Sequence, residues 1–135
     1  MQNAESMQGG IPRIVILSVI LVAICAPHAA EDFQFGAFAR LGISPSLPAA
    51  ALGVMFATQL AGAYLVGRRS PVGFALLIAV GAIWSVGALI LHGPEIIASG
   101  AYRNGVISKA LEVGIILVGA AMVIAGSIEW RKYRP

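Results

Sequence analysis

The hydrophobic pattern divides this chain into long apolar runs separated by short polar segments. Two of these runs, 47–66 and 72–91, contain no Asp, Glu, Lys, Arg or His, and a short turn over 67–71 joins them. At 1.5 Å of rise per residue, each run is long enough to cross a hydrocarbon core of about 30 Å. A surface helix of a soluble protein carries a polar stripe, and neither run has one. The pattern therefore predicts a transmembrane helical hairpin.

Two further apolar runs flank this hairpin and complete a four-pass pattern. We predict an all-α, four-transmembrane-helix bundle that forms a single membrane domain. Its segments are a disordered tail over 1–10, transmembrane helices over 11–30, 47–66, 72–91 and 110–128, outer connectors over 31–46 and 92–109, a cytoplasmic turn over 67–71 and a cytoplasmic tail over 129–135.

The first apolar run also has some features of a secretory signal peptide, because a positive residue precedes a short hydrophobic stretch. The expected cleavage region is a poor one, since Pro27 and His28 interrupt the small residues. A lipoprotein signal is equally poor, since the bulky Ile24 precedes Cys25 directly. We therefore favour an uncleaved helix, which extends to Ala30 if Pro27 only bends it.

Composition and charge support a membrane protein and set its orientation. Hydrophobic residues make up 59% of the chain and charged residues 11%, against about 25% charged in soluble domains. By the positive-inside rule, the basic residues close to helix ends mark the cytoplasmic side. Those that a four-pass threading places together are Arg13, Arg68, Arg69, Arg131, Lys132 and Arg134. We predict a bacterial inner-membrane protein with both termini cytoplasmic, embedded in lipid, with no nucleic acid as partner.

Small residues recur at helical spacing, which allows helix backbones to approach closely. They form three faces: Gly53, Ala57 and Ala61; Gly81, Ser85 and Ala88; Gly114, Ala121 and Ala125. The polar residues within the spans, Thr58, Gln59 and Ser85, are expected to form hydrogen bonds between helices. These faces suit packing within the bundle, in a homo-oligomer or in a larger membrane complex.

The connector after the first run mixes aromatic and charged residues, as in the headgroup layer of a membrane. It predicts a short interfacial helix or a re-entrant cap, in either case ending at Gly42. Ser46 then has the residue type and position of an N-cap for the second transmembrane helix.

The candidate chemistry lies at the outer ends of the helices, where the pattern His-x-x-Glu occurs twice. The two pairs are His28 with Glu31 and His92 with Glu95. Residues three apart share a helix face, so each pair could offer an imidazole and a carboxylate to one transition-metal ion. Two histidines on different helices could also hold a haem, although Cys-x-x-Cys-His is absent. The alternative is a solvated outer rim with no cofactor, and Pro94 argues against an ordinary helical pair at its position.

Glu112 lies about one turn into the predicted fourth span, three residues after Lys109. A Lys–Glu pair at this spacing would neutralise the carboxylate at the membrane interface. We expect this structural role for Glu112.

The layout resembles the small four-helix bacterial membrane proteins grouped as DoxX-like. The resemblance is carried by the chain length, the four spans and the outer connector that begins Glu31-Asp32-Phe33-Gln34-Phe35-Gly36. It implies an inner-membrane protein, in some members associated with redox or quinone-linked complexes. The small multidrug exporters have a similar size, but they need an acidic residue within the first helix, and 14–26 has none.

Three functional hypotheses follow. The first is a non-enzymatic accessory or structural subunit of DoxX-like type. The second is a protein that binds a metal or haem through His28, Glu31, His92 and Glu95. The third is a small-solute transporter with binding at the level of Gln59 and Trp84. No nucleotide-binding, hydrolase or HExxH motif is present in the sequence.

Overall fold

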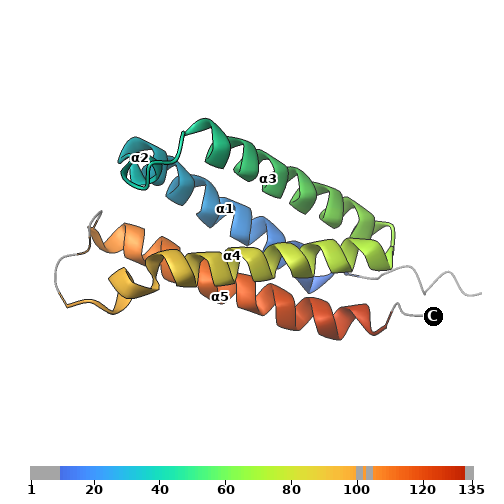
Figure 1. The fold of residues 1–135 in the computed structure, drawn as a ribbon. Helices are drawn as coiled ribbons and strands as arrows, with labels where there is room; N and C mark the ends of the chain where they lie inside the picture. The colour runs from blue at the N-terminus through green and yellow to red at the C-terminus, as the bar shows by residue number, and fades with distance from the viewer. Residues whose placement is uncertain (1–9, 100–101, 103–104, 133–135) are drawn as a thin grey trace, which may run out of the picture.

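The computed structural model of the chain describes residues 10–99, 102 and 105–132. In this part the elements are α1 (Arg13–Gln34), α2 (Ala37–Arg40), α3 (Ser46–Gly67), α4 (Pro71–Ile97) and α5 (Gly105–Trp130), and there is no strand (Figure 1). Within the described residues, the four long helices are each long and apolar enough to cross a membrane. The predicted all-α class and the four spans are therefore confirmed. The predicted tail over 1–10 lies outside the described residues except for Gly10.

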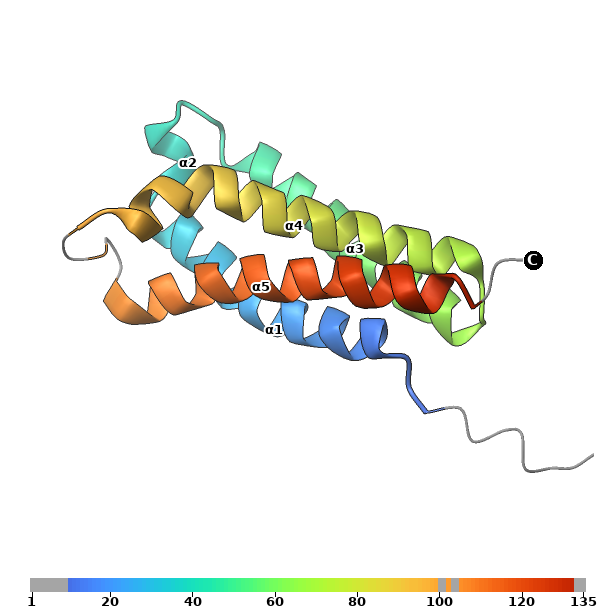
Figure 2. The same cartoon turned by 90° about the horizontal axis from the view of Figure 1, so that it is seen from below.

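The four long helices run alternately up and down, with α4 at the centre of the packing. Helix α4 packs against α3 and α5, α1 packs chiefly against α5, and α1 has only limited contact with α3 and α4. Figures 1 and 2 show that α1 begins and α5 ends at the same end of the bundle as the turn between α3 and α4. We call this the basic end, because Arg13, Arg68, Arg69, Arg131 and Lys132 belong to it. The opposite end, which carries α2, is called the α2 end.

Both internal prolines lie inside continuous helices. Pro27 belongs to α1, and Pro94 belongs to α4, which continues to Ile97. The expectation that Pro94 breaks the helical relation of its neighbours is therefore wrong. Proline lacks the N–H that would bond to the carbonyl four residues earlier in the helix. It is tolerated inside transmembrane helices because neighbouring groups can donate a hydrogen bond to that carbonyl instead. Ser46 is likewise the first residue of α3 and not its N-cap, a place that Pro45 takes. The predicted interfacial helix is α2, and Gly42 follows its C-cap at φ 70°.

Glycines set the distance between α4 and α5. A Cβ on Gly81 would lie 2.9 Å from the carbonyl oxygen of Gly119, and one on Gly119 would lie 2.7 Å from that of Gly81. Such distances leave room only for hydrogen, so the two backbones are in contact. The hydroxyl of Ser85 donates to the carbonyl of Ile116 at 2.8 Å beside this crossing. The close-packing face predicted around Gly81 and Ser85 is confirmed.

Helix α3 uses a different face from the predicted one. Gly53, Ala57 and Ala61 are exposed, whereas Gln59 and Gly62 are buried against the bundle. Because burial follows the positions that contact other helices, the exposed small-residue face has no packing role within the chain.

Two of the three polar residues form the predicted bonds between helices. The amide Nε2 of Gln59 donates to the carbonyl of Ser18 in α1 at 2.8 Å, and Ser85 donates to α5. Thr58 instead donates to the carbonyl of Val54 in its own helix. The expectation for Thr58 is therefore wrong, because its hydroxyl reaches the carbonyl four residues back.

A carboxylate from α5 caps the start of α1. Pro12 offers no side-chain acceptor at this terminus, and the first N–H groups of a helix have no partner within it. The backbone N–H of Arg13 donates to Oε1 of Glu129 at 3.0 Å, and that of Ile14 donates to Oε2 at 3.4 Å. The negative charge also lies at the favourable end of the helix dipole. Glu129 thus joins the first and last long helices at the basic end.

Replacing Glu129 by alanine is expected to lower the free energy of unfolding by about 1 kcal/mol, as for loss of a helix cap. Unfolding in SDS, followed by circular dichroism, measures this loss. Glu129→Gln keeps an acceptor oxygen and removes the charge, so its loss should be smaller. Equal stability of Glu129→Ala and the wild-type protein would contradict this role.

Candidate metal centre

Two histidines that are far apart in the sequence meet inside the bundle near the α2 end. His28 belongs to α1 and His92 to α4, and both are buried. Their Nε2 atoms are 3.4 Å apart, and the ring centroids are 4.9 Å apart in an edge-to-face arrangement. Both α1 and α4 run from the basic end towards the α2 end, and each histidine lies in the last third of its helix. The two histidines are therefore at a similar depth in the bundle.

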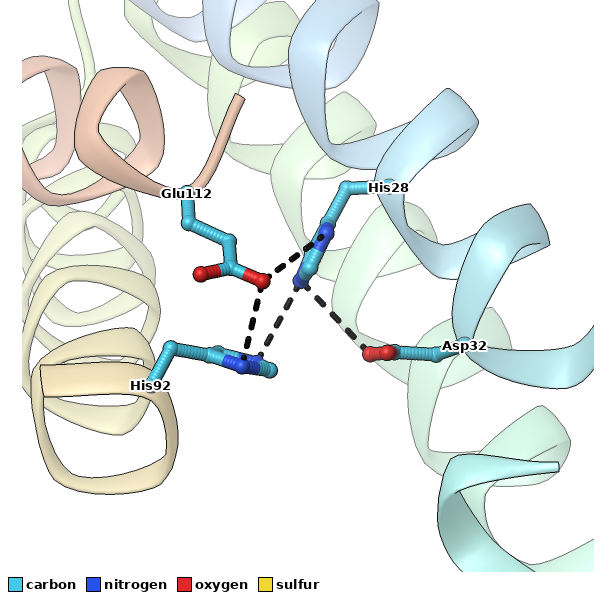
Figure 3. Close-up of polar contacts among 4 residues, drawn as sticks. All are labelled: His28, Asp32, His92 and Glu112. Carbon is cyan, nitrogen blue, oxygen red and sulfur yellow. Dashed lines mark hydrogen bonds and ion pairs between the residues drawn. The ribbon is translucent and has the colours of Figure 1, made fainter. Parts of the chain in front are cut away.

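Asp32 adds a carboxylate to this pair. It follows His28 by one helical turn, and its Oδ2 is 3.5 Å from Nε2 of His28. Asp32 is buried too. One ligand atom from each of His28, Asp32 and His92 can be chosen so that all three lie within 4.8 Å of one another. Figure 3 shows the three side chains converging from α1 and α4.

Glu112 contacts the opposite edges of the two imidazoles. Its side chain is fully buried, and its Oε1 is 3.2 Å from Nδ1 of His92 and 4.0 Å from Nδ1 of His28 (Figure 3). A histidine that binds metal through one ring nitrogen commonly donates the other N–H to a carboxylate, which fixes the tautomer and the ring orientation. The carboxylate of Glu112 lies nearest to that position on His92, at 3.2 Å from Nδ1, although this contact lacks hydrogen-bond geometry, and the 4.0 Å to Nδ1 of His28 is too long for a hydrogen bond.

The spacing of the donor atoms suits a single metal ion. Around a tetrahedral ion bound at 2.0–2.1 Å, neighbouring donor atoms are about 3.3–3.4 Å apart. The Nε2 atoms of the histidines are 3.4 Å apart, and the His28–Asp32 contact is 3.5 Å. The third edge, between Asp32 and His92, lies within 4.8 Å.

The structure brings together two of the four residues in the predicted ligand set. His28 and His92 meet, whereas the carboxylates within 4.0 Å of their ring nitrogens are those of Asp32 and Glu112. Glu31 and Glu95 are half-buried. Asp32 lies closer than Glu31 to the helix face of His28, because four residues turn an α-helix by a net angle of about 40° and three residues by about 60°.

The expected pairing of Glu112 with Lys109 is wrong. Glu112 is fully buried against the histidines, and no ion pair joins it to Lys109 within the described residues. The ammonium of Lys109 instead lies 5.8 Å from the ring centroid of Tyr102. Positions three apart on α5 differ by about 60° around the helix axis, which is enough to separate a buried position from a half-buried one.

The geometry does not suit a haem held between the two histidines. Their rings are in edge-to-face contact, which leaves no slot for a porphyrin. The neighbouring cavity, of about 240 Å³, is smaller than the roughly 300–1,000 Å³ of sites for drug-sized ligands.

This cavity lies between α1, α3 and α4, and the metal-ligand candidates form part of its wall. Its lining is almost entirely apolar, with His28, Asp32 and His92 as its polar part. Three protein ligands beside an open space are typical of metal sites that accept a further ligand, whereas structural sites are closed by four.

Comparison of the chain with protein-family models, with curated proteins and with solved structures finds no match.

Proposed function

We propose that this multi-pass membrane protein binds one divalent transition-metal ion through His28, Asp32 and His92, with Glu112 supporting the histidines. The observation that carries the proposal is the meeting of three buried ligand atoms within 4.8 Å of one another. Buried ionisable residues within a membrane bundle are costly, and they commonly mark a functional site. A bound cation would offset the charge of the carboxylates.

The donor set favours zinc, iron or manganese. Imidazole suits zinc and iron, carboxylate extends the choice to manganese, and two histidines with one carboxylate and open positions are typical of non-haem iron(II). No described thiol lies at the site, since Cys25 belongs to the apolar core. A soft ion such as copper(I) is therefore disfavoured.

Elemental analysis of protein purified in mild detergent tests this function, followed by removal of metal and titration with Zn²⁺ and Co²⁺. We expect one equivalent of ion per chain. We also expect visible absorption bands from bound Co²⁺, as for an ion held by protein ligands at a site of low symmetry. A protein that is metal-free when isolated and binds neither added ion would overturn the proposal.

The double variant Glu31→Gln/Glu95→Gln separates the two possible ligand sets. We expect it to bind Zn²⁺ with nearly the wild-type affinity, because Asp32 and Glu112 have carboxylate oxygens within 4.0 Å of the histidine ring nitrogens. The variant keeps His28 and His92. Loss of Zn²⁺ binding would therefore show that Glu31 or Glu95 is a metal ligand.

The proposal places the protein in a bacterial inner membrane, with the basic end cytoplasmic and the metal centre in the outer half of the bundle. The positive-inside rule supports this orientation, because the five described basic residues at the basic end are all close to helix ends. Labelling of the variants Ser44→Cys and Ser70→Cys in intact cells with a membrane-impermeant thiol reagent tests this orientation. We expect labelling of Ser44→Cys alone.

An accessory-subunit role of DoxX-like type is a second candidate. It is supported by the exposed face of Gly53, Ala57 and Ala61 on α3, which suits close approach of another transmembrane helix. A homo-oligomer or a larger complex would cover this face. Transport remains a third hypothesis, but Gln59 already donates to Ser18, which leaves only Trp84 of the two proposed residues on the cavity wall.

A further inference from the structure

Two carboxylate residues that the metal centre does not use lie between it and the α2 end. Glu31 follows His28 by three residues in α1, and Glu95 follows His92 by three residues in α4. Both helices run towards the α2 end (Figure 1), so each glutamate lies about 4.5 Å further along than its histidine. Each also belongs to the last turn of its helix. Glu31 and Glu95 are therefore placed between the centre and the water at this end.

These two glutamates reach from the surface into the interior. Both residues are half-buried, yet Oε2 of each has almost no exposed surface. Their negative charges are also close enough to act on that of Glu112, the fully buried carboxylate beside the histidines. An ion at this position could exchange water for carboxylate oxygens in steps, which avoids the cost of losing its whole hydration shell at once.

The route to the centre from the basic end is closed by apolar side chains. The buried residues that come next in this direction are Cys25 in α1, Ala88 in α4 and Ile115 in α5. Cys25 and Ile115 have no exposed surface. A divalent ion that passed between them would lose its hydration without gaining a charged ligand, which is strongly unfavourable.

The route through the side of the bundle is also apolar. The cavity next to the centre is lined at its outer edge by Ala51, Ile83 and Leu91, which are exposed on the surface of membrane-spanning helices. This side of the cavity therefore faces lipid. Because a charge in the hydrocarbon core is costly, ions do not arrive by this route.

We propose that the metal ion enters and leaves its centre at the α2 end, with Glu31 and Glu95 as transient ligands that pass it between water and the two histidines. This inference rests on the proposed metal site and adds its entry route. The ion then reaches the protein from one side of the membrane, which is the outer side in the orientation proposed above. A transient ligand lowers the barrier for transfer in both directions and leaves the stability of the bound state nearly unchanged.

Stopped-flow measurements on metal-free protein in detergent test this route. Growth of the visible Co²⁺ bands after mixing with Co²⁺ gives the association rate constant. Their loss in excess EDTA, at concentrations where the rate no longer depends on EDTA, gives the dissociation rate constant. In Glu31→Gln/Glu95→Gln we expect both constants to fall about tenfold, the lower end of what charged entrances contribute to association. Their ratio should stay close to that of the wild-type protein.

Two control variants locate the entrance. Glu129→Gln removes a carboxylate at the basic end and should leave both rate constants unchanged. Gly87→Leu extends a side chain into the apolar cavity, where a Cβ on Gly87 would meet nothing within 4 Å, and should also leave them unchanged. Slow association in Gly87→Leu with wild-type rates in the double variant would place the entrance in the cavity and overturn the inference.

The remaining outcomes separate this inference from the metal site itself. If the wild-type protein binds Co²⁺ and the double variant has unchanged rate constants, the entry route is wrong and the metal site stands. Slower association with unchanged dissociation would reduce the glutamates to distant charges, and faster dissociation would make them permanent ligands. Either result overturns their role as transient ligands. A wild-type protein that binds no added ion would overturn the site and the route together.

Discussion

Replacing His92 by alanine is expected to lower the affinity of the protein for Zn²⁺ by more than about 100-fold. The estimate exceeds the 10–100-fold typical for loss of an outer carboxylate, because His92 supplies a donor atom and also positions its neighbours. Its Nε2 is 3.4 Å from that of His28, and its Nδ1 is 3.2 Å from Glu112. Competition with a fluorescent zinc chelator measures the affinity in detergent.

A matched variant distinguishes direct from indirect ligands. Glu112→Gln keeps the size of the side chain and an acceptor oxygen, and we expect it to weaken Zn²⁺ binding by about 10–100-fold. Equal losses in the two variants would argue that Glu112 is itself a ligand. Unchanged affinity in His92→Ala would contradict the metal centre altogether.

Measuring the stability of each variant with and without Zn²⁺ shows whether a loss of binding comes from misfolding. A ligand at 100 times its dissociation constant adds about 2.7 kcal/mol to the free energy of unfolding. Zn²⁺ should therefore stabilise the wild-type protein against SDS, and should leave His92→Ala at its metal-free stability. His92→Gln fills the same space more closely, and serves as a second variant if alanine prevents folding.

The four spans could be predicted from the sequence because the bilayer imposes a single length scale on apolar helices. The runs 47–66 and 72–91 carry no charge, and the structure has α3 and α4 over both. Helix ends were less predictable, since α4 continues through Pro94 to Ile97. A proline restricts only its own turn, and whether a helix continues depends on neighbours that the sequence does not reveal.

The candidate site could be predicted only in part for a related reason. The alternating topology places the ends of α1 and α4 together, which is enough to bring His28 near His92. The choice of carboxylates depends on how far each helix is rotated about its axis. Asp32 and Glu112 face inward, whereas Glu31 and Glu95 are half-buried. One residue along a helix changes direction by about 100°, so the rotation had to be known before the ligands could be chosen.

The packing of α3 on α4 suggests a second large effect, at Gly73. A Cβ there would lie 2.5 Å from the backbone nitrogen of Val66 and 2.8 Å from the carbonyl oxygen of Gly62. Because both neighbours are backbone atoms, no side chain can rotate to make room. Gly73→Ala should force the two helices apart and lower the free energy of unfolding by about 3 kcal/mol, at the upper end of the usual cost of overpacking.

Gly67 provides the control for this prediction, because it lies in the same hairpin and a Cβ on it would meet nothing within 4 Å. Gly67→Ala should change the free energy of unfolding in SDS by no more than about 1 kcal/mol, the difference in helix propensity between the two residues. Equal stability of the two alanine variants would show that the α3–α4 contact is looser than these distances require.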